Sequence, residues 1–125
     1  MNSFKVSVVI PTMNRKEILK ACLTSVFKQT FDAVEVIVVD NNSTDGTGEM
    51  VKQCFPDVML LENGRNLGPA EARNQAIRIC RGDFLWFLDS DTIVLDAQCL
   101  SFMVSALAEH DDIGAIGAEM IEEKT

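Results

Sequence analysis

Short apolar runs alternate along this chain with segments in which apolar residues recur every three or four positions. The short runs consist mainly of valine, isoleucine, leucine and phenylalanine, and each ends at polar or turn-forming residues. Continuous runs of this kind are typical of strands that are buried on both faces of a parallel sheet. They predict strands at residues 6–10, 34–39, 58–61 and 84–88.

The periodic segments predict helices that follow these strands. Polar residues are placed to cap the first and last helices, and Pro69 fits the first position of the third. We expect helices at about residues 14–28, 47–54, 69–80 and 100–108, with Asn14 and Asp96 as the caps.

Strands that alternate with helices imply right-handed crossovers and a parallel sheet. The predicted fold class is therefore α/β, with three layers: a mostly parallel sheet flanked by helices on both faces. Residues 113–117 are apolar enough to begin a fifth strand. No repeat, linker or low-complexity segment interrupts the pattern, so we expect residues 1–125 to form a single domain.

The charge balance limits the ligands that this chain can hold. Its 125 residues include 19 acidic and 11 basic side chains, which gives a formal net charge of −8. A nucleic-acid-binding protein is therefore not expected, and a phosphate-bearing ligand would need a cation. No apolar run is long enough to span a membrane, and residues 1–5 do not resemble a signal peptide, so we expect a soluble, cytoplasmic chain.

The cysteines form no CxxC pair and His110 is the only histidine, so a structural zinc site is not expected. Each cysteine lies in or beside an apolar helical stripe, which favours small buried side chains without disulfide bonds. We expect Trp86 to lie in the core and His110 at the surface near the end of the last helix.

The apolar run FLWFL leads directly into two carboxylates, Asp89 and Asp91. Burial of an unpaired carboxylate is unfavourable, so both acids should lie where the strand leaves the core. In an extended segment their α-carbons would be about 7 Å apart, whereas oxygen ligands lie about 2.1 Å from Mg²⁺. One ion could contact both acids only if the chain bends. We expect Asp91 to bind a metal and Asp89 to contact its water shell or a sugar hydroxyl; two solvated acids in a turn are the alternative.

Polar residues follow the other predicted strands as well. Ligands bind beyond the carboxyl ends of strands in open parallel sheets, so these segments predict a polar crevice at one edge. There Asp40 could accept a hydrogen bond from the imide of a uracil or thymine base, and Arg73 could reach a base carbonyl or a diphosphate oxygen. Ordinary strand-to-helix turns would also explain both residues. The crevice should be formed by residues 11–15, 40–45, 63–68 and 89–91.

The chain resembles the family 2 glycosyltransferases of GT-A fold in four successive motifs, VSVVIPTMNR, VVDNNSTDGT, NLGPAEARNQAI and GDFLWFLDSDT. The resemblance covers roughly residues 5–117. It implies a nucleotide-diphosphate sugar donor, Mg²⁺ or Mn²⁺ as the cation, and transfer of the sugar to an acceptor hydroxyl with inversion. By position, it implies that Asp91 and Asp89 hold the metal and that the donor is bound by Pro11, Thr12, Asn14, Asp40, Asn42, Asn66, Arg73, Asp89 and Ser90.

Two departures from the family pattern affect this expectation. Asn41 and Asn42 stand where the family more often has Asp and Gly, which resembles branches that handle deoxysugars such as rhamnose. The family's general base lies further along than Thr125, so residues 1–125 would be the N-terminal half of a longer catalytic domain. We expect them to bind a UDP- or dTDP-linked donor and a metal with little or no transfer. The acceptor (glycan, lipid or protein) and peripheral association with the inner face of the membrane through other regions stay open.

Three other functions fit parts of the pattern. LDSDTIV is similar to the motif of haloacid dehalogenase-type phosphatases, but too little chain follows Asp91 to supply the later lysine and acids. A non-catalytic sugar-nucleotide-binding module of a larger assembly would differ only in what the whole protein does. A dehydrogenase is less favoured, because Val51 stands where the third glycine of GxGxxG would be.

Overall fold

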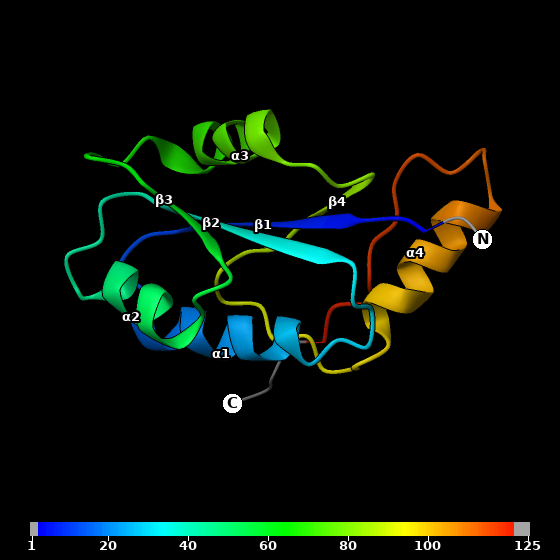
Figure 1. Cartoon of the computed structure of the whole chain (residues 1–125), viewed down its shortest axis with the longest axis horizontal. Helices are drawn as coiled ribbons and strands as arrows, with labels where there is room; N and C mark the ends of the chain where they lie inside the picture. The colour runs from blue at the N-terminus through cyan, green and yellow to red at the C-terminus, as the bar shows by residue number, and fades with distance from the viewer. Residues whose placement is uncertain (1–2, 122–125) are drawn as a thin grey trace.

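The computed structural model describes residues 3–121 as a parallel sheet between helices (Figure 1). Strands and helices alternate throughout these residues. The strands are β1 (Val6–Thr12), β2 (Val34–Asp40), β3 (Met59–Glu62) and β4 (Phe84–Phe87). The helices are α1 (Lys16–Phe27), α2 (Thr47–Cys54), α3 (Gly68–Ile79) and α4 (Cys99–Glu109). The predicted α/β class is confirmed.

The strand order is β3-β2-β1-β4, and each neighbouring pair is parallel. β1 pairs with β2 along its whole length, from Val6 opposite Val34 to Thr12 opposite Asp40. This register brings the carboxyl ends of both strands to the same edge of the sheet. Every residue of β1 is buried, because strands flank it and helices cover both of its faces.

The helices divide unevenly between the two faces of the sheet, as Figure 1 shows. α1, α2 and α4 contribute to the larger core, together with strand residues such as Val8 and Val38. α3 covers the other face, where the small side chains of Ala72 and Ala76 pack against Ile37. Within residues 3–121, no helix has the length and apolar content that a membrane span requires.

Two strand predictions were wrong. β4 is not buried on both faces, since Leu85 and Phe87 are 38% and 45% exposed while Phe84 and Trp86 pack against the larger core. The reason is that α3 packs over β1 and β2, which leaves one face of β4 uncovered in the described part of the chain. Residues 113–117 form no strand and are exposed. The ends of the predicted single domain, residues 1–2 and 122–125, lie outside the described residues.

The predicted helix caps were also wrong. α1 begins after Arg15, and neither α1 nor α4 has a side-chain cap hydrogen bond. Asn14 instead has a left-handed φ of 51°, and its Oδ1 accepts a hydrogen bond from Thr44 N at 2.7 Å, which ties two loops together. Asp96 Oδ1 accepts from the backbone N of Gln98, one residue before α4 begins.

The cysteines differ in burial more than the sequence predicted. Cys22 is buried, Cys80 and Cys99 are partly buried, and Cys54 is exposed; all are free thiols. Burial, with a smaller effect from Asp91, raises the pKa of the Cys22 thiol to about 11. Burial was therefore predicted wrongly for Cys54.

Candidate functional site

A groove of about 380 Å³ lies at the carboxyl-end edge of the sheet. Its walls come from the end of β1 and the following loop, the residue after β2, the start of α3 and the turn after β4. Of the residues proposed from the sequence for donor or metal, the groove is lined by Pro11, Thr12, Asn66, Asp89, Ser90 and Asp91. Its other lining residues are Met13, Arg15, Asn41 and Pro69.

The chain bends after β4, and the bend brings both acids of the DSD sequence to the groove. Thr92 N donates to the Asp89 carbonyl at 3.0 Å, so residues 89–92 form a β-turn. Ser90 is buried in this turn, whereas the Asp89 and Asp91 side chains are 71% and 58% exposed. The Cys22 thiol of α1 also contacts the Asp89 carbonyl, at 3.8 Å. The chain therefore bends after the strand, as contact of one cation with both acids would require.

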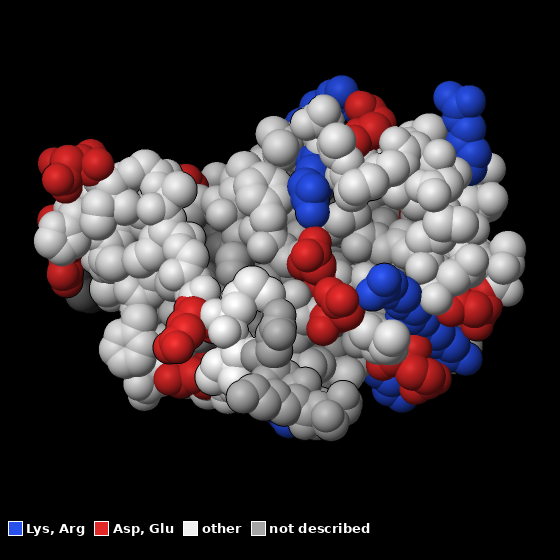
Figure 2. Space-filling view, turned by 180° about the vertical axis from the view of Figure 1, so that it is seen from behind, with Lys and Arg blue, Asp and Glu red and all other residues white. Residues whose placement is uncertain are grey.

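Each carboxylate of this turn forms an ion pair with a different arginine. One arginine lies at the start of α1 and the other lies in α3. Arg73 Nη2 in α3 lies 3.1 Å from Asp89 Oδ1, and Arg15 Nη1 lies 3.3 Å from Asp91 Oδ2. Figure 2 shows acidic side chains between basic ones in the middle of one face of the molecule. Because solvent screens exposed ion pairs, each should contribute less than about 1 kcal/mol to stability. Sequence reasoning did not assign a role to Arg15; its signal was its place in the loop directly after β1.

Thr12 lines the groove at the last position of β1. The residue is 5% exposed, and its Oγ1 is the one buried side-chain polar atom in residues 3–121 that lacks a hydrogen-bond partner. A buried polar group without a partner costs about 1–3 kcal/mol. A ligand or a water molecule in the groove would supply the missing partner.

Asn41, the residue after β2, lines another wall of the groove. The sequence alone did not assign it a definite role. It is buried; its Nδ2 donates to the Gly68 carbonyl at 3.2 Å, and its Oδ1 accepts from Asn63 Nδ2 at 2.9 Å. Asn63 and Gln75 exchange two further hydrogen bonds, at 2.8 and 2.9 Å. This network fixes the start of α3, where Gly68 has a φ of 81°, and so helps to place Arg73.

Four of the residues proposed from the sequence do not line the groove: Asn14, Asp40, Asn42 and Arg73, although Arg73 pairs with Asp89, which does. Asp40 is buried, and its Oδ1 accepts from the backbone N and the Oγ of Ser43, at 3.1 and 2.5 Å. Asn42 is exposed and has a φ of 66°, a conformation that asparagine adopts more readily than most residues other than glycine. The structure thus brings Asn41 rather than Asp40 to the groove.

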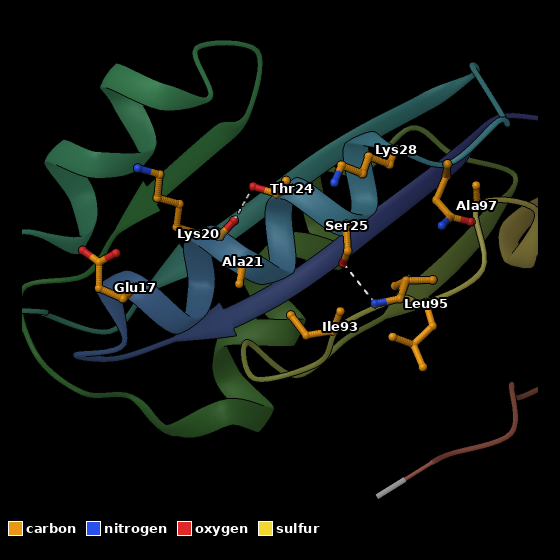
Figure 3. A pocket seen from close by; sticks show the side chains of 11 residues that line it. Glu17, Lys20, Ala21, Thr24, Ser25, Lys28, Ile93, Leu95 and Ala97 are labelled. Carbon is orange, nitrogen blue, oxygen red and sulfur yellow. Dashed lines mark hydrogen bonds between the residues drawn. The ribbon is translucent and has the colours of Figure 1, made fainter. Parts of the chain in front are cut away.

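A larger groove of about 620 Å³ lies between α1 and residues 93–97 (Figure 3). It is lined by Lys20, Lys28 and the exposed apolar Leu95, and Ser25 Oγ accepts from Val94 N within it at 3.0 Å. None of the residues proposed for donor or metal line it. The smaller groove is the better candidate, because it lies where parallel sheets bind ligands.

The donor set of the smaller groove suits a cation that arrives with its ligand. In residues 3–121 there is no cluster of three or more His, Cys, Asp or Glu side chains that could hold a metal ion. Mg²⁺ in phosphate-binding enzymes is held by one or two carboxylates, with water and substrate phosphates as the remaining ligands. Asp89 and Asp91 fit that arrangement.

Comparisons with known proteins identify the family. The family model described as glycosyl transferase family 2 matches residues 7–123. This chain belongs to glycosyl transferase family 2. It is 33% identical over 123 residues to the uncharacterized glycosyltransferase YibD of Escherichia coli K12. This match covers 95% of the present chain and 36% of YibD. It is 35% identical over 113 residues to Escherichia coli WfgD, named as a UDP-Glc:alpha-D-GlcNAc-diphosphoundecaprenol beta-1,3-glucosyltransferase. That match covers 89% of the present chain and 44% of WfgD.

Solved structures of other glycosyltransferases share the fold. The mannosyltransferase PcManGT from Pyrobaculum calidifontis, in complex with GDP-Man and Mn²⁺, matches with a TM-score of 0.79 and 31% identity over 86% of this chain and 33% of PcManGT. S. aureus TarS 1–349 in complex with UDP matches with a TM-score of 0.80 and 28% identity over 93% of this chain and 38% of TarS 1–349. The family 2 resemblance and the GT-A fold are confirmed, and the phosphatase and dehydrogenase alternatives are set aside. The chain spans less than half the length of each of these proteins.

Proposed function

We propose that this family 2 chain binds the donor of a glycosyl transfer, a nucleotide-diphosphate sugar, together with Mg²⁺ or Mn²⁺. The observation that carries the proposal is one groove in which an unpartnered buried hydroxyl, Thr12, lies with two exposed carboxylates, Asp89 and Asp91. Support comes from two solved relatives, which are in complex with UDP and with GDP-Man plus Mn²⁺. The net charge of −8 also favours a cation between the protein and a diphosphate.

The residues of the groove, together with Arg73 beside Asp89, would each contact a different part of the donor or the cation. Asp89 and Asp91 would hold the cation, Thr12 Oγ would exchange a hydrogen bond with the donor, and Asn66 and Ser90 would line its path. Arg73, already beside Asp89, would donate charge-assisted hydrogen bonds to the diphosphate. The bound cation would act as a Lewis acid toward the negative charge that develops on the leaving diphosphate.

The base of the donor is proposed to be uracil or thymine. WfgD is named for UDP-Glc, and TarS has also been solved with UDP-GlcNAc, whereas PcManGT was solved with GDP-Man. Asp40 would accept from the base imide, which requires its carboxylate to face the ligand as well as Ser43. Asn14 and Asn42, which do not line the groove, would contact parts of the donor that extend beyond it.

The transfer itself would invert the anomeric carbon and needs a general base for the acceptor hydroxyl. We propose that residues 1–125 are the donor-binding part of a longer catalytic domain whose base and acceptor site lie elsewhere. The same groove would serve a non-catalytic sugar-nucleotide-binding module, so transfer assays on the whole protein separate these two functions. By analogy with the lipid-linked substrate in the name of WfgD, we place the reaction in polysaccharide or cell-envelope synthesis at the cytoplasmic face of the membrane.

Calorimetric titration of UDP, dTDP and GDP, each with and without Mn²⁺, tests donor binding. We expect at least one nucleotide to bind in a Mn²⁺-dependent way and its affinity to fall about tenfold or more in Asp91→Ala. Asp57→Ala, which removes an exposed carboxylate before β3, is the matched control and should bind as the wild type does. Absence of binding by all three nucleotides, or unchanged affinity in Asp91→Ala, contradicts the proposal.

A further inference from the structure

Arg15 occupies a position that does not favour an arginine locally. It is the N-cap residue of α1, where its carbonyl accepts from Leu19 N at 2.7 Å but its side chain makes no cap hydrogen bond. A guanidinium has no acceptor atom, so it cannot cap a helix, and its positive charge opposes the helix dipole at this end. Because this side chain does not stabilise the helix, its contacts in the groove should explain why an arginine is present.

The contact that Arg15 makes is a single exposed ion pair. Its Nη1 lies 3.3 Å from Asp91 Oδ2, and both side chains are about half exposed. Within residues 3–121 this is its one polar side-chain contact, although a guanidinium carries five N–H donors. Exposed pairs of this kind are weak, so Arg15 can change partner at little cost.

Charge balance favours such a change when a donor binds. In the free chain, Asp89 and Asp91 are balanced by Arg73 and Arg15. A divalent cation and a guanidinium on the same carboxylate would repel each other at short range. A diphosphate, in contrast, presents adjacent anionic oxygens that match the two-pronged geometry of a guanidinium. The unpartnered Thr12 hydroxyl in the same groove independently indicates that a ligand belongs there.

We propose that Arg15 is a diphosphate-binding residue that exchanges Asp91 for the phosphate oxygens of the donor and leaves the Asp91 carboxylate to the cation. This inference rests on the donor site proposed above and adds a residue to it. In the free chain, Asp91 keeps the guanidinium beside the groove. In the loaded chain, Arg15 and Arg73 donate to the diphosphate from the α1 and α3 sides.

The exchange predicts effects of opposite sign on two affinities of the 125-residue chain. Arg15→Ala removes a competitor for Asp91, so Mn²⁺ alone should bind about threefold more tightly, as measured from the electron paramagnetic resonance signal of free Mn²⁺. The same variant loses a charged phosphate contact, so UDP should bind about tenfold more weakly in saturating Mn²⁺ by calorimetry. UMP, which lacks the second phosphate, should be affected less than UDP.

Two further variants separate this role from a structural one. Arg15→Lys keeps the charge but not the fork, so its UDP affinity should lie between those of the wild type and Arg15→Ala. Arg78→Ala is the matched control, because Arg78 forms an exposed ion pair with Glu71 at 3.1 Å outside the groove. Both of its affinities should equal those of the wild type. Urea unfolding of each variant checks that the fold is retained.

The outcomes distinguish the inference from the donor site on which it rests. If Asp91→Ala weakens UDP binding but Arg15→Ala leaves it within about twofold of the wild type, the donor site stands and the role of Arg15 is overturned. A parallel loss of Mn²⁺ and UDP affinity in Arg15→Ala also overturns it, because that result means that Arg15 only supports the turn. If the wild type binds neither UDP, dTDP nor GDP with Mn²⁺, the donor site itself fails.

Discussion

The two ends of β1 each bury a hydroxyl group, but the surroundings of the two groups differ. Near the amino end, Ser7 Oγ donates to Glu35 Oε2 at 2.5 Å and accepts from Gly82 N at 2.8 Å. At the carboxyl end, Thr12 Oγ1 is buried and has no partner in residues 3–121. The chain itself completes the amino end, whereas the proposed donor would complete the carboxyl end.

The contacts of the acidic side chains also differ between the two ends of β1. At the amino end, Glu35 Oε2 also accepts from Arg81 N at 2.5 Å, and Asp83 Oδ2 accepts from Lys5 N at 2.9 Å. At the carboxyl end, the carboxylates of the turn after β4 form exposed ion pairs with Arg73 and Arg15 and no other polar contact within residues 3–121. This contrast separates positions where a substitution should reduce stability from positions where it should reduce binding.

The largest effect is expected from Gly82→Ala at the amino end. A Cβ on Gly82 would lie 2.5 Å from Ser7 N and 2.9 Å from the Phe84 carbonyl, both backbone atoms of paired strands. Relief of this overlap would disturb the pairing of β1 with β4, so we expect a loss of about 3 kcal/mol in the free energy of unfolding by urea. Gly64→Ala, where a Cβ meets nothing within 4 Å, should change it by less than about 0.5 kcal/mol. Equal stabilities for the two variants would refute the tight packing of this end.

Ser7→Ala should produce the next largest loss. The substitution removes the buried hydroxyl that hydrogen-bonds both the Glu35 carboxylate and Gly82 N, so we expect a loss of about 2 kcal/mol. Urea unfolding of this variant beside the wild type measures it. A change below about 0.5 kcal/mol would mean that water replaces the hydroxyl and that this end is open to solvent.

Acid should weaken the amino end through Glu35. Partial burial raises the pKa of Glu35, but hydrogen bonds from Ser7 and Arg81 and the charges of Lys5 and Arg81 lower it below the ordinary 4.5 overall. A lowered pKa in the folded state means stabilisation above pH 4.5 that is lost as the pH falls through the folded value. Glu35→Gln should therefore lower stability by about 1 kcal/mol at neutral pH and approach the wild type in acid. A gap that stays constant between neutral and acidic pH would contradict this.

Thr12→Val should have little or no effect on stability. The replacement keeps the shape of the side chain and removes a hydroxyl that has no partner, so the free energy of unfolding should stay equal or rise by up to about 1 kcal/mol. The nucleotide diphosphate that the wild type binds should bind about fivefold more weakly, because one hydrogen bond is lost. A destabilisation as large as that of Ser7→Ala would show that both ends of β1 are completed by the chain.

The smallest expected effect on stability concerns the ion pair between Arg73 and Asp89. A double-mutant cycle with Arg73→Ala and Asp89→Ala should give a coupling energy in stability below about 1 kcal/mol. Added salt should reduce it further, since both side chains are accessible to solvent. A coupling above about 2 kcal/mol that persists in salt would place these charges in the rigid scaffold instead.

The pattern of apolar residues predicted the elements well and their environments less well. β1 and β2 were identified correctly because central parallel strands are apolar on both faces. β4 has an equally apolar sequence, yet Leu85 and Phe87 are exposed, because burial depends on which helix packs above the strand. The caps failed for a related reason: Asn14 found hydrogen-bond partners in the neighbouring β2–α2 loop instead of at the start of α1.

The order of strands, the helices between them and the acids after β4 followed from the local sequence, since periodicity and strand ends are properties of neighbouring residues. The contacts between the residues of the groove and its walls did not follow from the local sequence. Arg15 with Asp91, and Asn41 with Asn63, are contacts between loops that meet only after the sheet has formed. The placement of Asn41 in the groove instead of Asp40 likewise depends on the direction in which the chain turns after β2. Side chains at strand ends choose among several partners of similar energy, and the packing of the helices selects one of them.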